Sequence, residues 1–228
     1  VRVEYDKIFE QLKKVINGSD RPVIFNSGEL ADSLALEHLT GAARKFIPWF
    51  GATDNAYLYM LTKSDDVDDI LDLPHNGHTI VSWSINNAEV SRKFEIGAPP
   101  FARRLRAAEK VQSAGYPLRL RLDPIVPYDG WREGYAETIE MIFDKVTPER
   151  MTIGTLRFEK GFYDQRNSIY TTGPELPGYL EEMVPMFEPR YISGRKKPLI
   201  GKYSFCEEKR VEIFEFIVNE IRKHSDCG

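Results

Sequence analysis

Two hydrophobic spacings take turns along the chain. Short continuous apolar runs, bounded by glycine, proline or polar residues, predict buried β-strands. These runs are RPVIFNSG (21–28), AYLYMLTK (56–63), HTIVSWSIN (78–86), PLRLRLDPIVP (117–127) and MTIGTLRF (151–158). Apolar residues at helical intervals lie around them. They predict helices at 3–17, 34–50, 65–73, 130–146 and 207–224, and a long helical region that ends with 103–115.

Strands that alternate with helices at this interval predict a parallel sheet covered by its crossover helices. The chain nevertheless opens with a helix, and its first residue is Val1 rather than Met. We therefore expect a first strand and its loop to lie upstream of Val1. Without that strand, one edge of the sheet should be exposed and prone to aggregation or dimerisation.

Composition and charge narrow the possible classes. The 228 residues are 42% hydrophobic and 29% charged, which is typical of a globular domain with a full core. No apolar run approaches the roughly 20 residues that cross a bilayer, and the start does not read as a signal peptide. The net charge of −4 argues against a broadly cationic nucleic-acid surface. Cys206 and Cys227 match no zinc or iron–sulfur spacing, and a reducing cytoplasm fits best.

Ligands of parallel α/β folds gather at the carboxyl ends of the strands, and this rule selects the candidate residues. The predicted strand ends carry Asn26, Ser27, Gly28, Glu29, Thr62, Lys63, Ser64, Ser84, Asn86, Asp123, Pro124, Arg157 and Glu159. A carboxylate such as Glu29 can bind an ammonium group, whereas Lys63 and Ser84 can bind a carboxylate. Gly28 would let a ligand approach the backbone. Together they indicate a zwitterionic, hydroxyl-rich ligand, although each residue taken singly is more often a solvated loop residue.

Three other groups have simpler explanations than ligand binding. The acidic cluster is formed by Asp65, Asp66, Asp68 and Asp69. It could bind a metal, but carboxylates that open a helix more often cap it. His75 and His78 flank a turn that Asn76 and Gly77 predict by themselves. The basic run GRKKPLIGK (194–202) could meet DNA phosphates or be merely solvated.

Several ordered segments together resemble a known family. They are NSGELADS (26–33), LTKSDDVDDILDLPHNG (61–77), the long block from VSWSINNAEV to WREGY (81–135) and LIGKYSF (199–205). They resemble the radical S-adenosylmethionine enzymes, specifically the spore photoproduct lyase-like (DNA repair photolyase-like) group. The resemblance implies an α/β fold, a partial (β/α)6 TIM-like barrel of parallel strands whose first strand and cluster loop are missing here. It also implies a barrel core at 1–160, with strands 2 to 6, and a C-terminal extension with a closing helix at 161–228.

The resemblance further implies S-adenosylmethionine as a cofactor and assigns roles to residues. Gly28 and Glu29 are similar to the segment that meets its amino group, Lys63 to the lysine that meets its carboxylate, and Ser84 to the serine beside it. The backbone of residues 123–125 stands where the family's fifth strand lines the adenine. The implied cofactor-binding residues are Ser27, Gly28, Glu29, Lys63, Ser84, Asn86, Asp123, Pro124 and Ile125.

The chain departs from the family pattern at the cluster and at the hydrogen donor. The Cys-x3-Cys-x2-Cys motif that holds the family's 4Fe-4S cluster is absent, and two distant cysteines cannot replace it. The resemblance places the cluster ligands upstream of Val1, so this chain alone is expected to be inactive. The lyases' hydrogen-donating cysteine is also absent, because the matching stretch is ELAD (29–32). A carboxylate cannot give a hydrogen atom to a thymine radical, so lyase-like ancestry is expected but activity on a thymine dimer is not.

Three functions follow as hypotheses. The first is the core of a radical S-adenosylmethionine enzyme that generates a 5′-deoxyadenosyl radical in the full-length protein, with an electron donor as partner. Its substrate class includes nucleic acid, with DNA contacts at Arg195, Lys196, Lys197 and Lys202. The second is a cluster-free barrel that binds a nucleotide-like or nucleic-acid ligand without radical chemistry. The third, a cofactor-free hydrolase or lyase, is disfavoured because no nucleophile and base occur in a supporting context.

Overall fold

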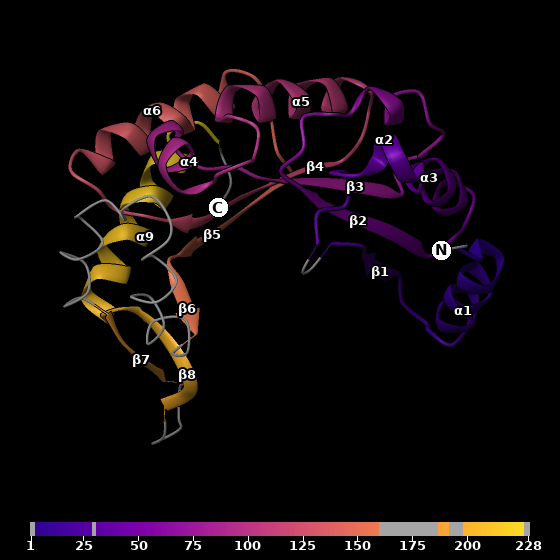
Figure 1. Cartoon of the computed structure of the whole chain (residues 1–228), viewed down its shortest axis with the longest axis horizontal. Coiled ribbons are helices and arrows are strands. Elements are labelled where there is room, and N and C mark those ends of the chain that lie inside the picture. Colours follow the sequence, from indigo (N-terminus) through magenta and orange to yellow (C-terminus); the bar gives the residue numbers. More distant parts are fainter. Residues whose placement is uncertain (1–2, 29–30, 160–186, 192–197, 226–228) are drawn as a thin grey trace. The chain divides into compact units, whose positions relative to one another are not determined.

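The computed structural model describes residues 3–28, 31–159, 187–191 and 198–225. Figure 1 traces its helices and strands along the chain. The chain divides into two compact units, one formed by 1–121 with 141–152 and the other by 122–140 with 153–228. The predicted division into 1–160 and 161–228 stays a prediction.

The main sheet has five strands in the order β1-β2-β3-β4-β5. They are β1 (Val23–Asn26), β2 (Ala56–Thr62), β3 (Thr79–Ser84), β4 (Leu118–Ile125) and β5 (Arg150–Thr155). The pairs from β1 to β4 are parallel, with Asn26 opposite Tyr59 and Thr62 opposite Trp83. The predicted α/β class is therefore confirmed, since the parallel strands form the half-barrel of a partial TIM-like fold. The carboxyl ends of neighbouring strands lie at one edge of this sheet.

The helices are α1 (Tyr5–Asn17), α2 (Glu37–Thr40), α3 (Ala43–Gly51), α4 (Ala88–Phe94), α5 (Phe101–Ser113), α6 (Trp131–Phe143) and α9 (Glu207–Arg222). The stretch predicted as one helix at 34–50 breaks at Gly41, whose φ of 56° is left-handed. The long region before 115 is interrupted ahead of α5, where Pro100 is the N-cap, because proline removes a helical donor and restricts the residue before it. The prediction of a helix at 65–73 is wrong, since only the 3₁₀ turn η1 (Asp68–Ile70) forms there.

The core of the first unit lies between the sheet and its helices. Trp83 and Ile47 are fully buried, and the Trp83 indole Nε1 donates to the carbonyl of Ser64 at 2.9 Å. In α1, Phe9 stacks on Trp49 with 4.8 Å between ring centroids. On α1, Ile16 is buried whereas Val15 is 53% exposed.

The second unit contains an antiparallel sheet of order β6-β8-β7. Its strands are β6 (Arg157–Glu159), β7 (Phe187–Tyr191) and β8 (Pro198–Phe205). Trp131 and Tyr135 of α6 are buried, and Trp131 meets Phe216 of α9 edge-to-face with ring centroids 5.1 Å apart. The Tyr135 hydroxyl accepts a hydrogen bond from the Val126 N–H at 3.0 Å, so it satisfies a buried donor just after β4. Across the described ranges, no helix is long and apolar enough to cross a membrane.

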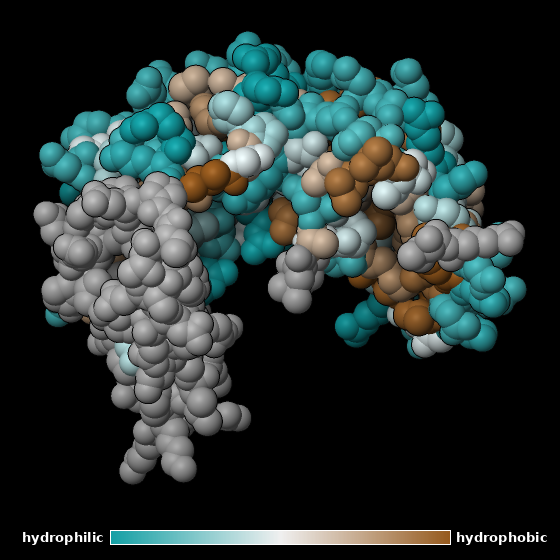
Figure 2. Space-filling model, viewed as in Figure 1, coloured by the Kyte–Doolittle hydropathy of each residue, from teal (hydrophilic) through white to brown (hydrophobic). Residues whose placement is uncertain are grey.

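The strand β1 stands at one end of the sheet order, so its outer edge has no strand partner among the described residues. Ile24 on this strand is 53% exposed. Figure 2 shows hydrophobic surface gathered around α1, β1 and α3, on the right of the view. An apolar edge of this kind is a template for pairing with another chain.

Replacing Ile24 by lysine should reduce self-association of the protein, because a charge on an edge strand opposes edge-to-edge pairing. Sedimentation velocity over a concentration series measures the effect. Val15→Lys is the matched control, because Val15 is also 53% exposed but lies on α1. Equal association of the two variants and the wild type would contradict a role for the β1 edge.

Candidate functional site

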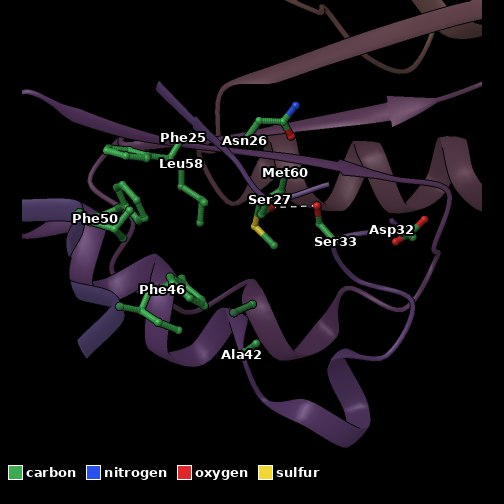
Figure 3. A pocket seen from close by; sticks show the side chains of 13 residues that line it. Phe25, Asn26, Ser27, Asp32, Ser33, Ala42, Phe46, Phe50, Leu58 and Met60 are labelled. Atoms are coloured by element: carbon green, nitrogen blue, oxygen red, sulfur yellow. Dashed lines mark hydrogen bonds between the residues drawn. The ribbon is translucent and has the colours of Figure 1, made fainter. Parts of the chain in front are cut away.

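The loop after β1 folds back onto β2. Ser33 N–H donates to the Leu61 carbonyl at 2.9 Å, and Leu61 N–H donates to Ser33 Oγ at 3.1 Å. Ser27 Oγ and Ser33 Oγ lie 2.9 Å apart in a hydrogen bond that Figure 3 shows as a dashed line. The loop therefore extends the pairing of β2 beyond the end of β1. Glu29, the predicted partner of an ammonium group, lies outside the described residues.

Asp32 anchors this loop to the end of β2. Its Oδ1 accepts from Leu34 N–H and Ala35 N–H, both at 2.9 Å, and from Thr62 Oγ1 at 2.7 Å. Its Oδ2 accepts from the backbone N–H of Lys63 at 2.6 Å. The strand-end pattern did not select Asp32. An aspartate whose side chain accepts hydrogen bonds from the backbone N–H groups two and three residues later is nevertheless a known turn signal. Asp32 thus fixes the backbone from which the Lys63 side chain projects.

Gly28 is buried at the start of the same loop. A Cβ built there would lie 2.8 Å from the Ala31 carbonyl oxygen and 3.0 Å from that of Leu61, which leaves no room for a side chain. Its N–H donates to Asn26 Oδ1 at 3.0 Å. The close approach that requires glycine here is thus made by the chain itself.

A pocket of about 380 Å³ lies beside this loop in the first unit. Figure 3 shows its lining side chains, most of which are apolar and come from α1, β1, α3 and β2. The polar residues on its wall are Asn26, Ser27, Asp32 and Ser33. Of the predicted cofactor-binding residues, Ser27 lines this pocket, whereas Lys63 and Ser84 do not.

Lys63, just after β2, and Ser84, the last residue of β3, are linked through Glu95 and Arg104. The Lys63 ammonium lies 2.6 Å from Glu95 Oε1. Arg104, on α5, pairs with the other oxygen of Glu95, and its Nη1 donates to the Ser84 carbonyl at 2.9 Å. Arg104 is fully buried, and its Nη2 also donates to Ser91 Oγ. The sequence pattern did not single out Glu95 or Arg104, because they come from the loop after α4 and from a helix rather than from strand ends.

The electrostatics of this group favour ionised side chains. Burial raises the pKa of Glu95, but the hydrogen bonds from Arg104 and Lys63 oppose burial and bring the pKa below its ordinary value. Glu95 is therefore a carboxylate at neutral pH. One carboxylate and two cations leave a net positive charge, and the Lys63 side chain that carries it is 38% exposed.

Asn86, another predicted cofactor-binding residue, is 1% exposed just beyond β3. Its Oδ1 accepts from the N–H of Asn87 at 2.9 Å. Asn87 in turn caps α4 by accepting from the N–H of Glu89 at 2.8 Å. This pair holds the turn from β3 into α4.

Asp123 lies in the second unit and binds Arg157 through both carboxylate oxygens. The guanidinium donates to Oδ1 at 2.7 Å and to Oδ2 at 2.9 Å. The hydrogen bond to Asp123 raises the pKa of Arg157 above its ordinary value, against the opposite effect of burial. A Cβ at Gly154 would lie 2.7 Å from Asp123 Oδ1, so this carboxylate packs directly on β5. Because the predicted role of residues 123–125 uses their backbone, this side-chain pairing does not interfere with it.

The acidic cluster makes salt bridges instead of capping a helix, so that expectation is corrected. Asp66 lies 3.9 Å from His38, Asp68 2.7 Å from Lys110 and Asp69 2.5 Å from Arg44, and Asp65 pairs with Arg103. Partners supplied by α2, α3 and α5 hold this segment, in which no α-helix forms. Among the residues that the structure describes, no three His, Cys, Asp or Glu side chains are grouped so as to hold a metal ion.

Two remaining predictions concern the histidine turn and the basic run. The turn is confirmed, since Asn76 and Gly77 have φ of 48° and 76° and the His78 N–H donates to the His75 carbonyl at 2.8 Å. Residues 195–197 of the basic run lie outside the described residues. Lys202 is on β8, at the position opposite Glu159 of β6. Nucleic-acid binding by the run stays a prediction.

A parallel half-barrel with charged and polar residues at its strand ends defines a class of α/β proteins that bind ligands at that edge. The chain belongs to the spore photoproduct lyase family of radical S-adenosylmethionine proteins, because the family model "Spore photoproduct lyase" matches residues 1–224. The resemblance noted in the sequence is thereby confirmed.

Relatives and solved structures agree with this membership. The spore photoproduct lyase of Geobacillus sp. (strain Y412MC61) is 37% identical over 160 residues, which are 70% of this chain and 46% of that protein. That of Clostridium acetobutylicum is 23% identical over 97% of this chain and 64% of its own length. A solved spore photoproduct lyase variant with bound AdoMet (S-adenosylmethionine) and dinucleoside spore photoproduct matches with a TM-score of 0.83 and 30% identity, over 99% of this chain and 66% of that one. The chain therefore spans less than two thirds of each of these proteins.

Replacing Asp32 by asparagine should lower the free energy of unfolding by about 1–3 kcal/mol, because an amide nitrogen would face one of the donors that the carboxylate now accepts. Urea denaturation measures this change. Asp20→Asn, at an exposed position after α1, is the control and should have little effect. Equal midpoints for the two variants would contradict the anchoring role.

Replacing Glu95 by glutamine should remove part of the acid sensitivity of the fold. Because the pKa of Glu95 is lowered from 4.5, its stabilisation is fully present above that pH and is lost as the pH falls through the lowered value. The stability difference between wild type and Glu95→Gln should thus shrink as urea denaturation is repeated at pH values below 4.5. A difference that stays constant through this range would contradict the ionised pair.

Proposed function

We propose that this chain is the AdoMet-binding core of a radical S-adenosylmethionine enzyme in the spore photoproduct lyase family. The observation that supports this most is the placement of Lys63 and Ser84. They lie next to each other at the ends of β2 and β3, and the side chains of Lys63, Glu95 and Arg104 together carry a net positive charge. An ammonium and a hydroxyl in this position are suited to hold a carboxylate. The family's solved structures include one with AdoMet bound.

In this proposal the methionyl carboxylate of AdoMet binds Lys63 and Ser84. Glu29 pairs with its ammonium, as the resemblance implies, and Ser27 and Gly28 shape the loop that carries Glu29. Asn86 holds the turn after Ser84. The adenine-lining role of residues 123–125, which belong to the second unit, remains a separate prediction.

The residues of this chain do not fit the iron–sulfur cluster of the family. The sequence has two cysteines, whereas the family's cluster is held by three. Cys206, the first of them, is a half-buried thiol at the start of α9. When AdoMet is bound together with a reduced cluster, it supplies a 5′-deoxyadenosyl radical, and the work of this chain is to bind AdoMet, orient it and exclude water.

The proposed substrate class is nucleic acid. Solved relatives have been described with dinucleoside spore photoproduct, and the basic run of this chain offers Arg195, Lys196, Lys197 and Lys202 for phosphate contacts. Glu29 stands where the resemblance expects a hydrogen-donating cysteine. Since a carboxylate cannot donate a hydrogen atom, we do not assign the thymine-dimer reaction to this chain.

Release of 5′-deoxyadenosine tests the radical chemistry. The protein is expressed from its complete reading frame, reconstituted anaerobically with iron and sulfide, and supplied with AdoMet and reductant, with and without ultraviolet-damaged DNA. AdoMet-dependent release is the expected result, and stimulation by damaged DNA supports the substrate class. No release from protein with an assembled cluster contradicts the proposal and favours a barrel that binds a nucleotide-like ligand without radical chemistry.

Replacing Lys63 by methionine should weaken AdoMet binding about tenfold, because a charged hydrogen bond to the carboxylate is lost. Equilibrium dialysis with labelled AdoMet measures this change. Lys110→Met is the matched control, since Lys110 is 52% exposed and pairs with Asp68 on the surface. Equal affinities of the two variants would contradict the assignment of Lys63.

A further inference from the structure

We propose that Glu95 and Arg104 are positioning residues that aim Lys63 at a bound carboxylate and keep its positive charge available. This inference rests on the proposed function and deepens it. Lys63 is the cation proposed to bind the ligand carboxylate, yet it is already paired with Glu95. That pairing alone would oppose carboxylate binding, and the proposed role of Arg104 explains why it does not.

The geometry shows how the side chain of Lys63 is held. Its ammonium has three donors, and the contact with Glu95 at 2.6 Å uses one of them. Glu95 cannot shift freely, since its second oxygen is bound by Arg104 and its side chain is only 8% exposed. Arg104 is in turn fixed by the Ser84 carbonyl at 2.9 Å and by Ser91. Lys63 is therefore held toward the end of β3, with donors left for a ligand.

The charges explain why the pairing does not cancel Lys63. A lone Glu95 carboxylate would neutralise the ammonium beside it. Arg104 contributes a guanidinium cation, and with none of its side chain exposed it stays close to Glu95. The inner pair is then neutral. The remaining charge is located on the Lys63 side chain, which is the exposed member of the three at 38%.

The same contacts link the two strand ends. Arg104 joins the Ser84 backbone to Glu95, and Glu95 joins Arg104 to Lys63. A change at Arg104 therefore alters both the charge at Lys63 and the support of Ser84. Adding Glu95→Gln to an Arg104 variant restores the charge at Lys63 but not the support of Ser84, so it separates the two effects.

The test compares two ligands and three variants by equilibrium dialysis of the protein expressed from its complete reading frame. The ligands are AdoMet and decarboxylated AdoMet, which lacks the carboxylate but keeps the amine, sulfonium and adenosine. Arg104→Met should weaken AdoMet binding about tenfold while changing decarboxylated AdoMet less than about twofold, because an unbalanced Glu95 then cancels Lys63. Glu95→Gln combined with Arg104→Met should restore AdoMet affinity to within about threefold of wild type. Arg104→Lys, which keeps the charge, should stay closer to wild type than Arg104→Met.

The outcomes separate the inference from the proposed function. If the wild type does not prefer AdoMet over its decarboxylated analogue, the proposed function fails. If the wild type discriminates but Arg104→Met weakens both ligands equally and the double variant does not recover, Arg104 has only a structural role and the inference is overturned. If Arg104→Met does not fold, the double variant decides, because it has the wild-type net charge without the buried pair. It is expected to keep most of the wild type's preference for AdoMet, because the charge at Lys63 is restored although its support is not, and loss of that preference in folded protein overturns the inference.

Discussion

Parallel pairing of β2 with β3 places Thr62 opposite Trp83, so the next residue in each segment also lies beside the other. These residues are Lys63, just after β2, and Ser84, the last residue of β3. Their proximity is thus a consequence of register, and it does not require the loops to be ordered first. A one-residue slip would turn every side chain of a strand to the other face and separate the pair.

The register alone does not settle what these two residues can do, because the charge around Lys63 depends on side chains supplied by other segments. Glu95 comes from the loop after α4 and Arg104 from α5. Their ion pair is largely removed from water, and such a pair is stabilising only when its remaining hydrogen-bonding atoms are satisfied. The Ser84 carbonyl and Ser91 accept from the terminal nitrogens of Arg104, and Lys63 donates to Glu95, whereas Arg104 Nε is buried without a hydrogen-bond partner among the described residues. The strand ends and the buried pair therefore depend on one another.

Much of the fold could be predicted from the sequence because strand and helix spacings are local signals. The five strands were predicted, and they form the main sheet in their order along the chain. Helix ends were harder to predict. Gly41 and Pro100 interrupt helical spacing through backbone geometry that hydrophobic periodicity does not record. The acidic segment was wrongly predicted as a helix because its carboxylates pair with distant cations, which only the folded chain brings near.

Some residues of the candidate site could likewise be identified from local sequence signals, whereas others could not. Lys63 and Ser84 could be selected from the sequence because both lie at strand ends, and the ends of parallel strands share an edge. The role of Asp32 could have been predicted, since turn-forming aspartates have a local sequence signature. Glu95 and Arg104 could not be found, because their roles arise from contacts across 32 and 20 residues of chain. No spacing rule relates a helix residue to the strand end that its side chain reaches.

The most direct test of the central claim is a crystal structure of the protein expressed from its complete reading frame and bound to AdoMet. The account predicts that the methionyl carboxylate lies within hydrogen-bond distance of the Lys63 ammonium, while Glu95 still bridges Lys63 and Arg104. AdoMet bound elsewhere, or a Lys63 side chain turned away from its carboxylate, would contradict it.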